Sequence, residues 1–389
     1  MKKCLFFLFF VLVQISYSQW ETCNLGTYNG FISGLYVDGN NIFACTSSGV
    51  FFSTDDGDNW LKKNTGLVDT NVFRLLIDGK NILASTQQKG VYLSTDYGEN
   101  WNELQNQFSD QPVYCFALSG NNIFAGTYGR GVFLSTDKGA SWTKKNFGLT
   151  DTTIFTLNVT GNKVFAGSSQ KGIFVSIDSG NTWFPKNNGL PDVGGFISIN
   201  SININENIAY AAATFGIYVS NDFGENWIQK TPQNISNIGA ITFSDNNIFA
   251  GSNDYKGVYV SSDKGDNWIA KNSGLLSKMI YCLSNNNKYV YAGTSTGISR
   301  AKISEITSVD SKNVENNLFE VFPNPANKNL SLVFNNKFIQ NKVEIFNLLG
   351  LKVCEYVVED KDFTINIETL LCGTYFLKID NSCKIFVKN

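Results

Sequence analysis

The chain has 389 residues, of which 43% are hydrophobic and 14% aromatic, and its net charge is -2. That apolar content is enough for one or more packed domains, and the charge offers no basic surface for nucleic acid. The absence of histidine excludes Ser-His-Asp and Cys-His catalysis and every histidine-ligated metal site. We predict no catalytic residue, no metal and no cofactor from composition and motifs.

Residues 1–18 have the pattern of a signal peptide. Lys2 and Lys3 precede an apolar run over residues 5–13, which is too short to span a bilayer. Small residues at Ser16 and Ser18 fit a cleavage site, with Gln19 as the new N-terminus. No later segment predicts a transmembrane helix, and the signal peptide predicts a secreted protein.

An eight-residue motif, SxDxGxxW, recurs six times at an almost constant spacing. Its copies begin 41, 41, 41, 44 and 41 residues apart, at Ser53, Ser94, Ser135, Ser176, Ser220 and Ser261. Three short apolar segments precede each copy, and a fourth begins at its tryptophan. Four strands in a unit of about 40 residues are typical of one blade of a β-propeller.

The motif itself predicts a tight hairpin between the third and fourth strands of each unit. Glycine supplies the backbone conformation of the turn, and the serine and aspartate side chains can bind nearby backbone N–H groups. We therefore assign a structural role to the aspartates and tryptophans of the motif: Asp55, Asp96, Asp137, Asp178, Asp222, Asp263, Trp60, Trp101, Trp142, Trp183, Trp227 and Trp268.

A seventh tryptophan, Trp20, stands outside the six motifs. Its spacing to Gly26 equals that of Trp60 to Gly66, so it begins a fourth strand that lacks the first three. Residues 281–301 match three strands without a fourth. We predict an all-β fold, with a seven-bladed β-propeller over residues 19–303 that the N-terminal strand closes.

A second domain follows a polar linker over residues 304–317. Short alternating segments run from residue 318 to residue 389, with turns near Gly350 and Asn381. They predict a small β-sandwich.

The C-terminal segment resembles the type A sorting domain of the Bacteroidetes type IX secretion system. The resemblance covers residues 318–389 and rests on FPNPA at 322–326, VEIFN at 343–347 with Gly350, and LCGTYF at 371–376. It implies that the type IX secretion machinery is a partner of this domain. It also implies export across the outer membrane, usually with removal of the domain and then release or surface attachment.

The repeats resemble the Asp-box (BNR) propellers, a group that includes sialidases, xyloglucanase-type hydrolases, sortilin-like receptors and photosystem assembly factors. The group shares the box but no single activity. A sialidase needs an arginine cluster for the substrate carboxylate, whereas this chain has only Arg74, Arg130 and Arg300 and lacks the Arg-Ile-Pro motif. We therefore exclude sialidase activity.

One rim of the predicted propeller carries the candidate binding residues. Four aspartates recur at 41-residue steps before the innermost strands: Asp69, Asp110, Asp151 and Asp192. The variable loops between second and third strands add Gln87, Tyr128, Arg130, Lys171, Phe215 and Tyr255. Loops on a rigid scaffold commonly carry binding sites, so we expect a surface binding module for a glycan or a protein.

Other interpretations of the same residues remain open. Carboxylates such as Asp69 and Asp151 could serve a polysaccharide hydrolase of the xyloglucanase type, or could simply cap turns. The loops could be ordinary solvated surface, and the protein a scaffold in a surface assembly. The cysteines after the signal peptide number seven, and we expect them to be small buried side chains rather than a disulfide framework.

Overall fold

The computed structural model describes residues 18–104, 108, 111–205, 207–231, 235–307, 319–334, 341–348, 350–358, 362–379 and 382–389. Two compact units divide the chain, one up to Thr307 and one from Ser308. The predicted signal peptide, apart from Ser18, lies outside the described residues, as do residues 308–317 of the predicted linker.

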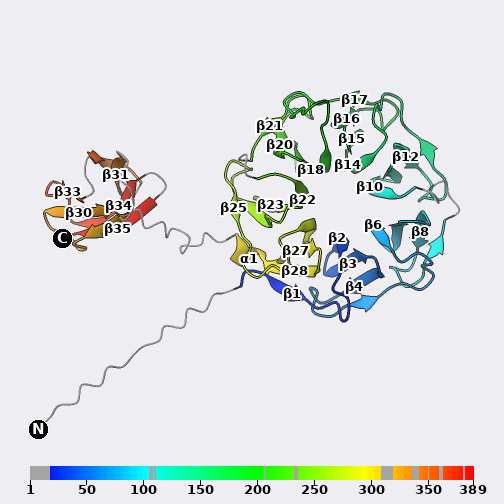
Figure 1. Ribbon diagram of the computed structural model, residues 1–389, viewed down its shortest axis with the longest axis horizontal. Helices are drawn as coiled ribbons and strands as arrows, with labels where there is room; N and C mark the ends of the chain where they lie inside the picture. The colour runs from blue at the N-terminus through cyan, green and yellow to red at the C-terminus, as the bar shows by residue number, and fades with distance from the viewer. Residues whose placement is uncertain are drawn as a thin grey trace, which may run out of the picture. The chain divides into compact units, whose positions relative to one another are not determined.

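The first unit contains seven four-stranded antiparallel sheets, which Figure 1 shows standing around a common axis. The first strand of each sheet is nearest the axis. These strands are β2 (Ile32–Asp38), β6 (Val72–Asp78), β10 (Val113–Ser119), β14 (Ile154–Thr160), β18 (Ile199–Asn205), β22 (Ile238–Ser244) and β26 (Ile280–Asn285). Each packs against the first strand of the next sheet, and β26 packs against β2.

The second and third strands make up the middle of every sheet. The second strands are β3 (Asn41–Thr46), β7 (Asn81–Thr86), β11 (Asn122–Thr127), β15 (Lys163–Ser168), β19 (Ile208–Ala213), β23 (Asn247–Ser252) and β27 (Tyr289–Thr294). The third strands are β4 (Gly49–Ser53), β8 (Val91–Ser94), β12 (Val132–Ser135), β16 (Ile173–Ser176), β20 (Gly216–Ser220), β24 (Val258–Ser261) and β28 (Gly297–Lys302).

The outer strands are short and exposed. They are β5 (Leu61–Lys62), β9 (Asn102–Glu103), β13 (Thr143–Lys144), β17 (Phe184–Pro185), β21 (Ile228–Gln229), β25 (Ile269–Ala270) and β1 (Glu21–Cys23). β1 pairs with β28 and so completes the sheet of the last three strands, with Glu21 opposite Arg300. The two ends of the unit therefore meet in one sheet, as the position of Trp20 predicted.

The hydrophobic core lies between neighbouring sheets. Second strands are buried on both faces, which explains their continuous apolar sequences, such as Ile123-Phe124-Ala125. Phe124 is fully buried among residues of its own sheet and of the next, including Ile154 and Trp183. Burying one such side chain contributes about 1.5–3 kcal/mol, so the stability of each sheet depends on its neighbours.

The SxDxGxxW motif, called the box below, forms a network of hydrogen bonds at each hairpin between third and outer strands. Ser53 Oγ accepts the Gly57 N–H (2.9 Å) and donates to Asp55 Oδ1 (2.8 Å). Asp55 also accepts the backbone N–H of Asn59 (2.9 Å) and its side-chain amide (2.7 Å). The other five boxes repeat this arrangement, with Asn, Ser or Thr in the place of Asn59.

Five of the seven tryptophans donate their indole N–H to the backbone of the preceding sheet, whereas those of Trp60 and Trp142 donate to the glycine of their own motif. The Trp101 backbone N–H donates to Thr65 O (2.8 Å), and its indole N–H donates to Lys63 O (2.8 Å). Gly66 permits this approach, because a Cβ there would lie 2.1 Å from the Trp101 carbonyl oxygen and its φ is +90°. Trp183, Trp227 and Trp20 meet Gly148, Gly189 and Gly274 in the same way. The recurring Trp–Gly spacing therefore marks the contact between sheets.

The predicted linker begins later than expected. A one-turn helix, α1 (Ile303–Ile306), follows β28, and Ile306 is fully buried against the last sheet. Residues 304–307 thus belong to the first unit. Ile303 and Ile306 are three residues apart, so both side chains lie on the same face of the helix and pack against the sheet.

The second unit has two sheets around one core. One contains β29 (Phe319–Phe322), β30 (Asn329–Phe334) and β33 (Asp362–Asn366). The other contains β32 (Lys352–Val358), β31 (Asn341–Asn347), β34 (Gly373–Ile379) and β35 (Ser382–Lys388). Leu332 from the first and Leu377 from the second lie fully buried in the same cluster. Asn324 links the Pro-Asn-Pro segment to β35, since its side chain donates to Ile385 O (3.0 Å) and accepts the Val387 N–H (2.9 Å).

We expect Trp20→Ala to lower the free energy of unfolding of the first unit by about 3–5 kcal/mol, the usual cost of truncating a buried tryptophan. Trp20 is 1% exposed, and its indole donates to Lys271 O (2.7 Å), so the change also breaks the contact between the two ends. Denaturant unfolding measures the loss, with Thr22→Ala, an exposed position in the strand β1 that follows Trp20, as control. Equal stability of the two variants would contradict the role of Trp20.

Acid should weaken the boxes. Hydrogen bonds from the side chain and backbone four residues later lower the pKa of Asp55, Asp96, Asp137, Asp178 and Asp222 to about 2. An unfolded aspartate titrates near 3.9, so this stabilisation is complete above about pH 5 and is lost as the pH falls toward 2. The thermal unfolding midpoint should fall over that interval.

The pH series has a matched pair of variants. Asp137→Asn should lower the midpoint relative to the native protein at pH 7, and the difference should shrink toward pH 2, because the native carboxylate is then protonated. Asp78→Asn removes an exposed carboxylate outside any box and controls for the change of charge. A difference for Asp137→Asn that stays constant down to pH 2 would show that its charge is not what braces the turn.

Candidate functional site

Every first strand carries a β-bulge at its second residue. In β2 the pairing moves from Ile32 opposite Thr46 to Gly34 opposite Cys45, which leaves Ser33 without an opposite residue. The same shift occurs in the other six first strands. A bulge re-aims the side chain of its extra residue. We name the seven bulge residues the axial collar: Ser33, Phe73, Tyr114, Phe155, Asn200, Gly239 and Tyr281.

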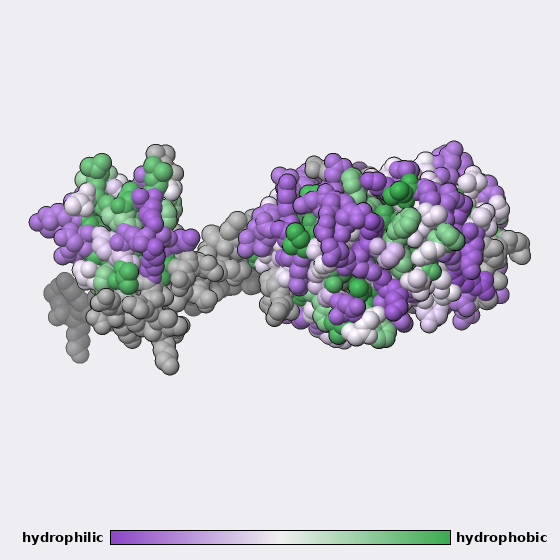
Figure 2. All heavy atoms as spheres, turned by 90° about the horizontal axis from the view of Figure 1, so that it is seen from above, coloured by the Kyte–Doolittle hydropathy of each residue, from purple (hydrophilic) through white to green (hydrophobic). Residues whose placement is uncertain are grey.

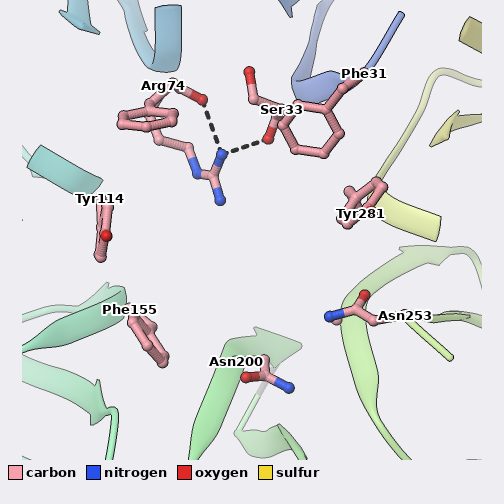
Figure 3. Close-up of a pocket in the computed structure, with 10 residues that line it drawn as sticks. Phe31, Ser33, Arg74, Tyr114, Phe155, Asn200, Asn253 and Tyr281 are labelled. Carbon is pink, nitrogen blue, oxygen red and sulfur yellow. Dashed lines mark hydrogen bonds between the residues drawn. The ribbon is translucent and has the colours of Figure 1, made fainter. Parts of the chain in front are cut away.

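The axial collar surrounds a pocket of about 250 Å³ where the first strands begin. Phe31, Arg74 and Asn253 complete its lining, and Figure 3 shows side chains from separate sheets facing one central space. Each sheet therefore contributes one or more residues to a single site.

Aromatic rings form one arc of the collar. The Tyr114 ring centroid lies 6.0 Å from that of Phe73 and 5.8 Å from that of Phe155. Tyr281 packs edge-on against Phe31 at 4.4 Å. Burial raises the pKa of Tyr114 and of Tyr281, so both hydroxyls keep their protons and can donate or accept hydrogen bonds.

Amides form the opposite part of the collar. Gly239 has no side chain, and the Asn253 amide occupies the space, since a Cβ on Gly239 would lie 2.0 Å from Asn253 Oδ1. Asn253 Oδ1 is buried and has no hydrogen-bond partner among the described residues. Asn200 donates its side-chain N–H to Ile238 O (2.9 Å). The pocket thus combines aromatic rings with two amide groups.

Arg74 is the one charged residue that lines the pocket. Its Nη1 donates to Phe73 O (2.8 Å) and to Ser33 O, which fixes the guanidinium at the edge of the pocket (Figure 3). Arg300, in contrast, is paired with Asp58 (2.7 Å) and Glu21 (3.3 Å). No Asp or Glu lines the pocket, so its local charge is positive.

Two thiols lie directly after the collar. Cys115 and Cys282 follow Tyr114 and Tyr281, and burial raises the pKa of both thiols to about 12. They are therefore protonated and poor nucleophiles. All six cysteines whose side chains the structure describes are free, namely Cys23, Cys45, Cys115, Cys282, Cys354 and Cys372. The side chain of Cys383 lies outside the described part.

The predicted rim aspartates are engaged in loop structure. Asp69 accepts the N–H groups of Asn71 (3.0 Å) and Gln88 (2.7 Å). Asp151 accepts those of Thr153 (2.9 Å) and Gln170 (2.8 Å). Each carboxylate thus caps its own turn and binds the loop after the second strand. Asp192 accepts the Gly195 N–H (2.6 Å), and Asp110 lies outside the described residues.

The predicted loop residues occupy different positions relative to the pocket. Tyr128 is 51% exposed, and its ring centroid lies 5.7 Å from that of Tyr114, so it extends the aromatic arc outward. Tyr255 is 66% exposed and contributes to the raised pKa of Tyr281.

The remaining predicted loop residues make local contacts. The Gln87 side chain accepts from Asn71, and Lys171 Nζ donates to Gly195 O (3.2 Å). The backbone oxygen of Arg130 accepts the side-chain N–H of Asn146 (2.7 Å), and that of Phe215 accepts the side-chain N–H of Gln229 (2.9 Å). None of these four residues lines the axial pocket.

The axial collar is not predicted by the sequence. A signal was present, because aromatic residues recur 41 residues apart at 73, 114 and 155. Regular alternation along a strand places the second residue on the same face as the fourth, so only the bulge reveals that it points to the axis. The collar also includes unlike residues, which hides its period.

Comparison with known proteins identifies the C-terminal segment. Residues 320–389 match the family model of the secretion system C-terminal sorting domain. This domain indicates a secreted or cell-surface protein. In the described part of the chain, no helix has the length and apolar content needed to cross a membrane. No curated protein matches the chain.

Solved structures with a similar fold are extracellular or propeller-like. The extracellular domain of the putative one-component system BT4673 from B. thetaiotaomicron is 19% identical, with a TM-score of 0.64 over 82% of this chain and 46% of that one. PorZ, a surface component of the type IX secretion system of Porphyromonas gingivalis, is 14% identical, with a TM-score of 0.58 over 95% and 61%.

A glycoside hydrolase is also similar. The GH74 xyloglucanase from Xanthomonas campestris is 13% identical, with a TM-score of 0.56 over 89% of this chain and 60% of that one. Structural similarity at such low sequence identity shows a shared fold and says nothing about activity. This chain spans less than half the length of the BT4673 domain.

Proposed function

We propose that residues 19–303 form a seven-bladed Asp-box propeller that serves as a secreted or cell-surface binding module, with a carbohydrate bound in the axial pocket. The sorting domain supplies the export route through the type IX secretion machinery. The observation that supports this function best is the axial collar, in which seven equivalent positions from seven sheets converge on one pocket.

The chemistry of the collar favours a sugar. Ligand sites are mostly apolar and aromatic surfaces with a few placed polar groups. The arc of Phe73, Tyr114 and Phe155 offers flat apolar faces to the C–H side of a pyranose ring. Asn200 and Asn253, from the other side, offer donors and acceptors that match hydroxyl groups.

The side of the first unit that Figure 2 shows offers less for specific binding. Figure 2 views the first unit along the plane of its ring, and the visible apolar residues form small groups between hydrophilic ones. Exposed apolar residues that are scattered in this way are ordinary protein surface. The axial pocket is therefore the better candidate for specific binding.

The hydrolase alternative has less support. Glycoside hydrolysis uses two carboxyl groups on opposite sides of the scissile bond, and none lines this pocket. The carboxylates considered for that role, Asp69 and Asp151, accept backbone N–H groups in their loops. The similarity to the xyloglucanase extends to the fold alone.

We expect the full-length protein to bind selected oligosaccharides on a glycan array, and Tyr114→Ala to reduce that binding at least tenfold. A contact between an aromatic side chain and a ring contributes about 0.5–1.5 kcal/mol beyond the free energy of burying its surface. Tyr114→Ala also loses the free energy of burying that surface, so the total loss of binding free energy is larger. Titration calorimetry with the best glycan on the array measures the change.

Two further variants define the extent of the site. Tyr128→Ala and Arg130→Ala alter the rim loop outside the pocket, and a smaller loss than that of Tyr114→Ala places the ligand on the axis. A larger loss would move the site to the rim loops. Silence of the native protein across a broad array would contradict a carbohydrate ligand and favour a protein partner or a scaffold role. Release of reducing ends from the bound glycan would favour the hydrolase.

A further inference from the structure

We propose that the axial pocket recognises an acidic sugar, a hexuronate residue, whose carboxylate pairs with Arg74. This inference rests on the proposed function and narrows the ligand from any carbohydrate to one with a negative charge. Three observations carry it: the charge of Arg74 has no partner, its free donors face the pocket, and the pocket has the size and lining of a single-ring site.

The first observation is the unpaired charge. Arg74 is partly buried, and among the described residues no Asp or Glu forms an ion pair with it. The residues that line the axial channel below the pocket likewise include no other charged side chain. A half-buried guanidinium without a counter-charge gains charge-assisted hydrogen bonds when an anion binds beside it. An anionic ligand would supply the missing charge.

The second observation is the geometry of the guanidinium. Both recorded hydrogen bonds of the Arg74 side chain use Nη1, which donates to the carbonyls of Ser33 and Phe73. Nε and Nη2 have no partner among the described residues, so one edge of the planar group is free. Two parallel N–H donors on one edge match a carboxylate, which accepts them in a bidentate arrangement.

The third observation is the pocket around this edge. A volume of about 250 Å³ is at the small end for ligand sites, so it suits one ring rather than an extended chain. Beside Arg74, the Phe73 and Tyr114 rings supply stacking faces. Across the pocket, the Asn253 side-chain amide lines the space and can form a hydrogen bond with a ring hydroxyl. A bare inorganic anion would leave the rings and the amide unused.

The test compares charged and uncharged forms of one sugar on the full-length protein. The probes are tri-galacturonic acid and its methyl ester, which differ in charge but keep the same ring, and titration calorimetry measures both. We expect the native protein to bind the acid at least tenfold more tightly than the ester, because hydrogen bonds between charged groups are the stronger kind. The preference should decrease as salt is added.

Variants then assign the preference to Arg74. Arg74→Gln should weaken binding of the acid about 10- to 100-fold and leave binding of the ester unchanged, whereas Arg74→Lys should retain part of the preference. Lys80→Gln removes an equal charge from an exposed turn between first and second strands, and it should change neither affinity. Thermal unfolding checks that each variant is folded. If Arg74→Gln does not fold, the comparison of acid and ester on the native protein still tests whether the site prefers a carboxylate.

The outcomes separate this inference from the proposed function. Equal binding of acid and ester, with loss in Tyr114→Ala, would overturn the carboxylate and keep a carbohydrate site. A preference for the acid that survives Arg74→Gln would move the carboxylate away from Arg74. If a short peptide binds through its free C-terminal carboxylate and neither sugar binds, the result would overturn both the hexuronate ligand and the proposed carbohydrate-binding function.

Discussion

The contact between successive sheets is the constraint on which the first unit depends. Each second strand is buried on both faces, so no sheet has a core of its own. In five of the seven sheets the tryptophan also reaches the backbone of its neighbour. That approach requires a residue without a side chain at Gly66 and its equivalents, where a Cβ would overlap a carbonyl oxygen. Sequence spacing, hydrogen bonding and packing therefore express one requirement, which is that neighbouring sheets come close enough to share a core.

The two rims of the first unit divide structural and variable roles between them. The Asp-boxes on one rim repeat the same hydrogen bonds six times and leave little freedom for their residues. On the other rim, the bulges place one residue per sheet at the axis, and in six of the seven sheets that residue has a side chain. Residues as different as Phe73, Asn200 and Gly239 therefore occupy equivalent positions. Because each sheet contributes one residue, the pocket can combine several kinds of chemical group at equivalent positions.

The sequence predicted the repeated parts well and the exceptions poorly. The six boxes, the strand order and the role of Trp20 followed from periodicity, because those positions have a local physical requirement. The axial collar did not follow, since a bulge shifts the register by one residue and leaves no signature in hydrophobic alternation. Asp69 and Asp151 belong to the four aspartates that recur at 41-residue steps, and the sequence alone leaves open whether they cap turns or face a ligand. The distances to Gln88 N and Gln170 N, in loops about 20 residues away, show that they tie two loops together.

The pairing of β1 with β28 has a consequence for how the molecule folds. Most sheets form from one continuous segment and pack against the segment before them, so assembly can proceed along the chain from short-range contacts. The last sheet is different, because Glu21 and Arg300 are 279 residues apart. This sheet cannot be completed until the chain has been synthesised as far as β28. Bringing together two segments that are so far apart in the sequence is also slow. Until then the interface that receives Trp20 is open, and the incomplete ring exposes apolar surface that other chains could bind. The step most vulnerable to aggregation is therefore the final one, after most of the structure is already in place.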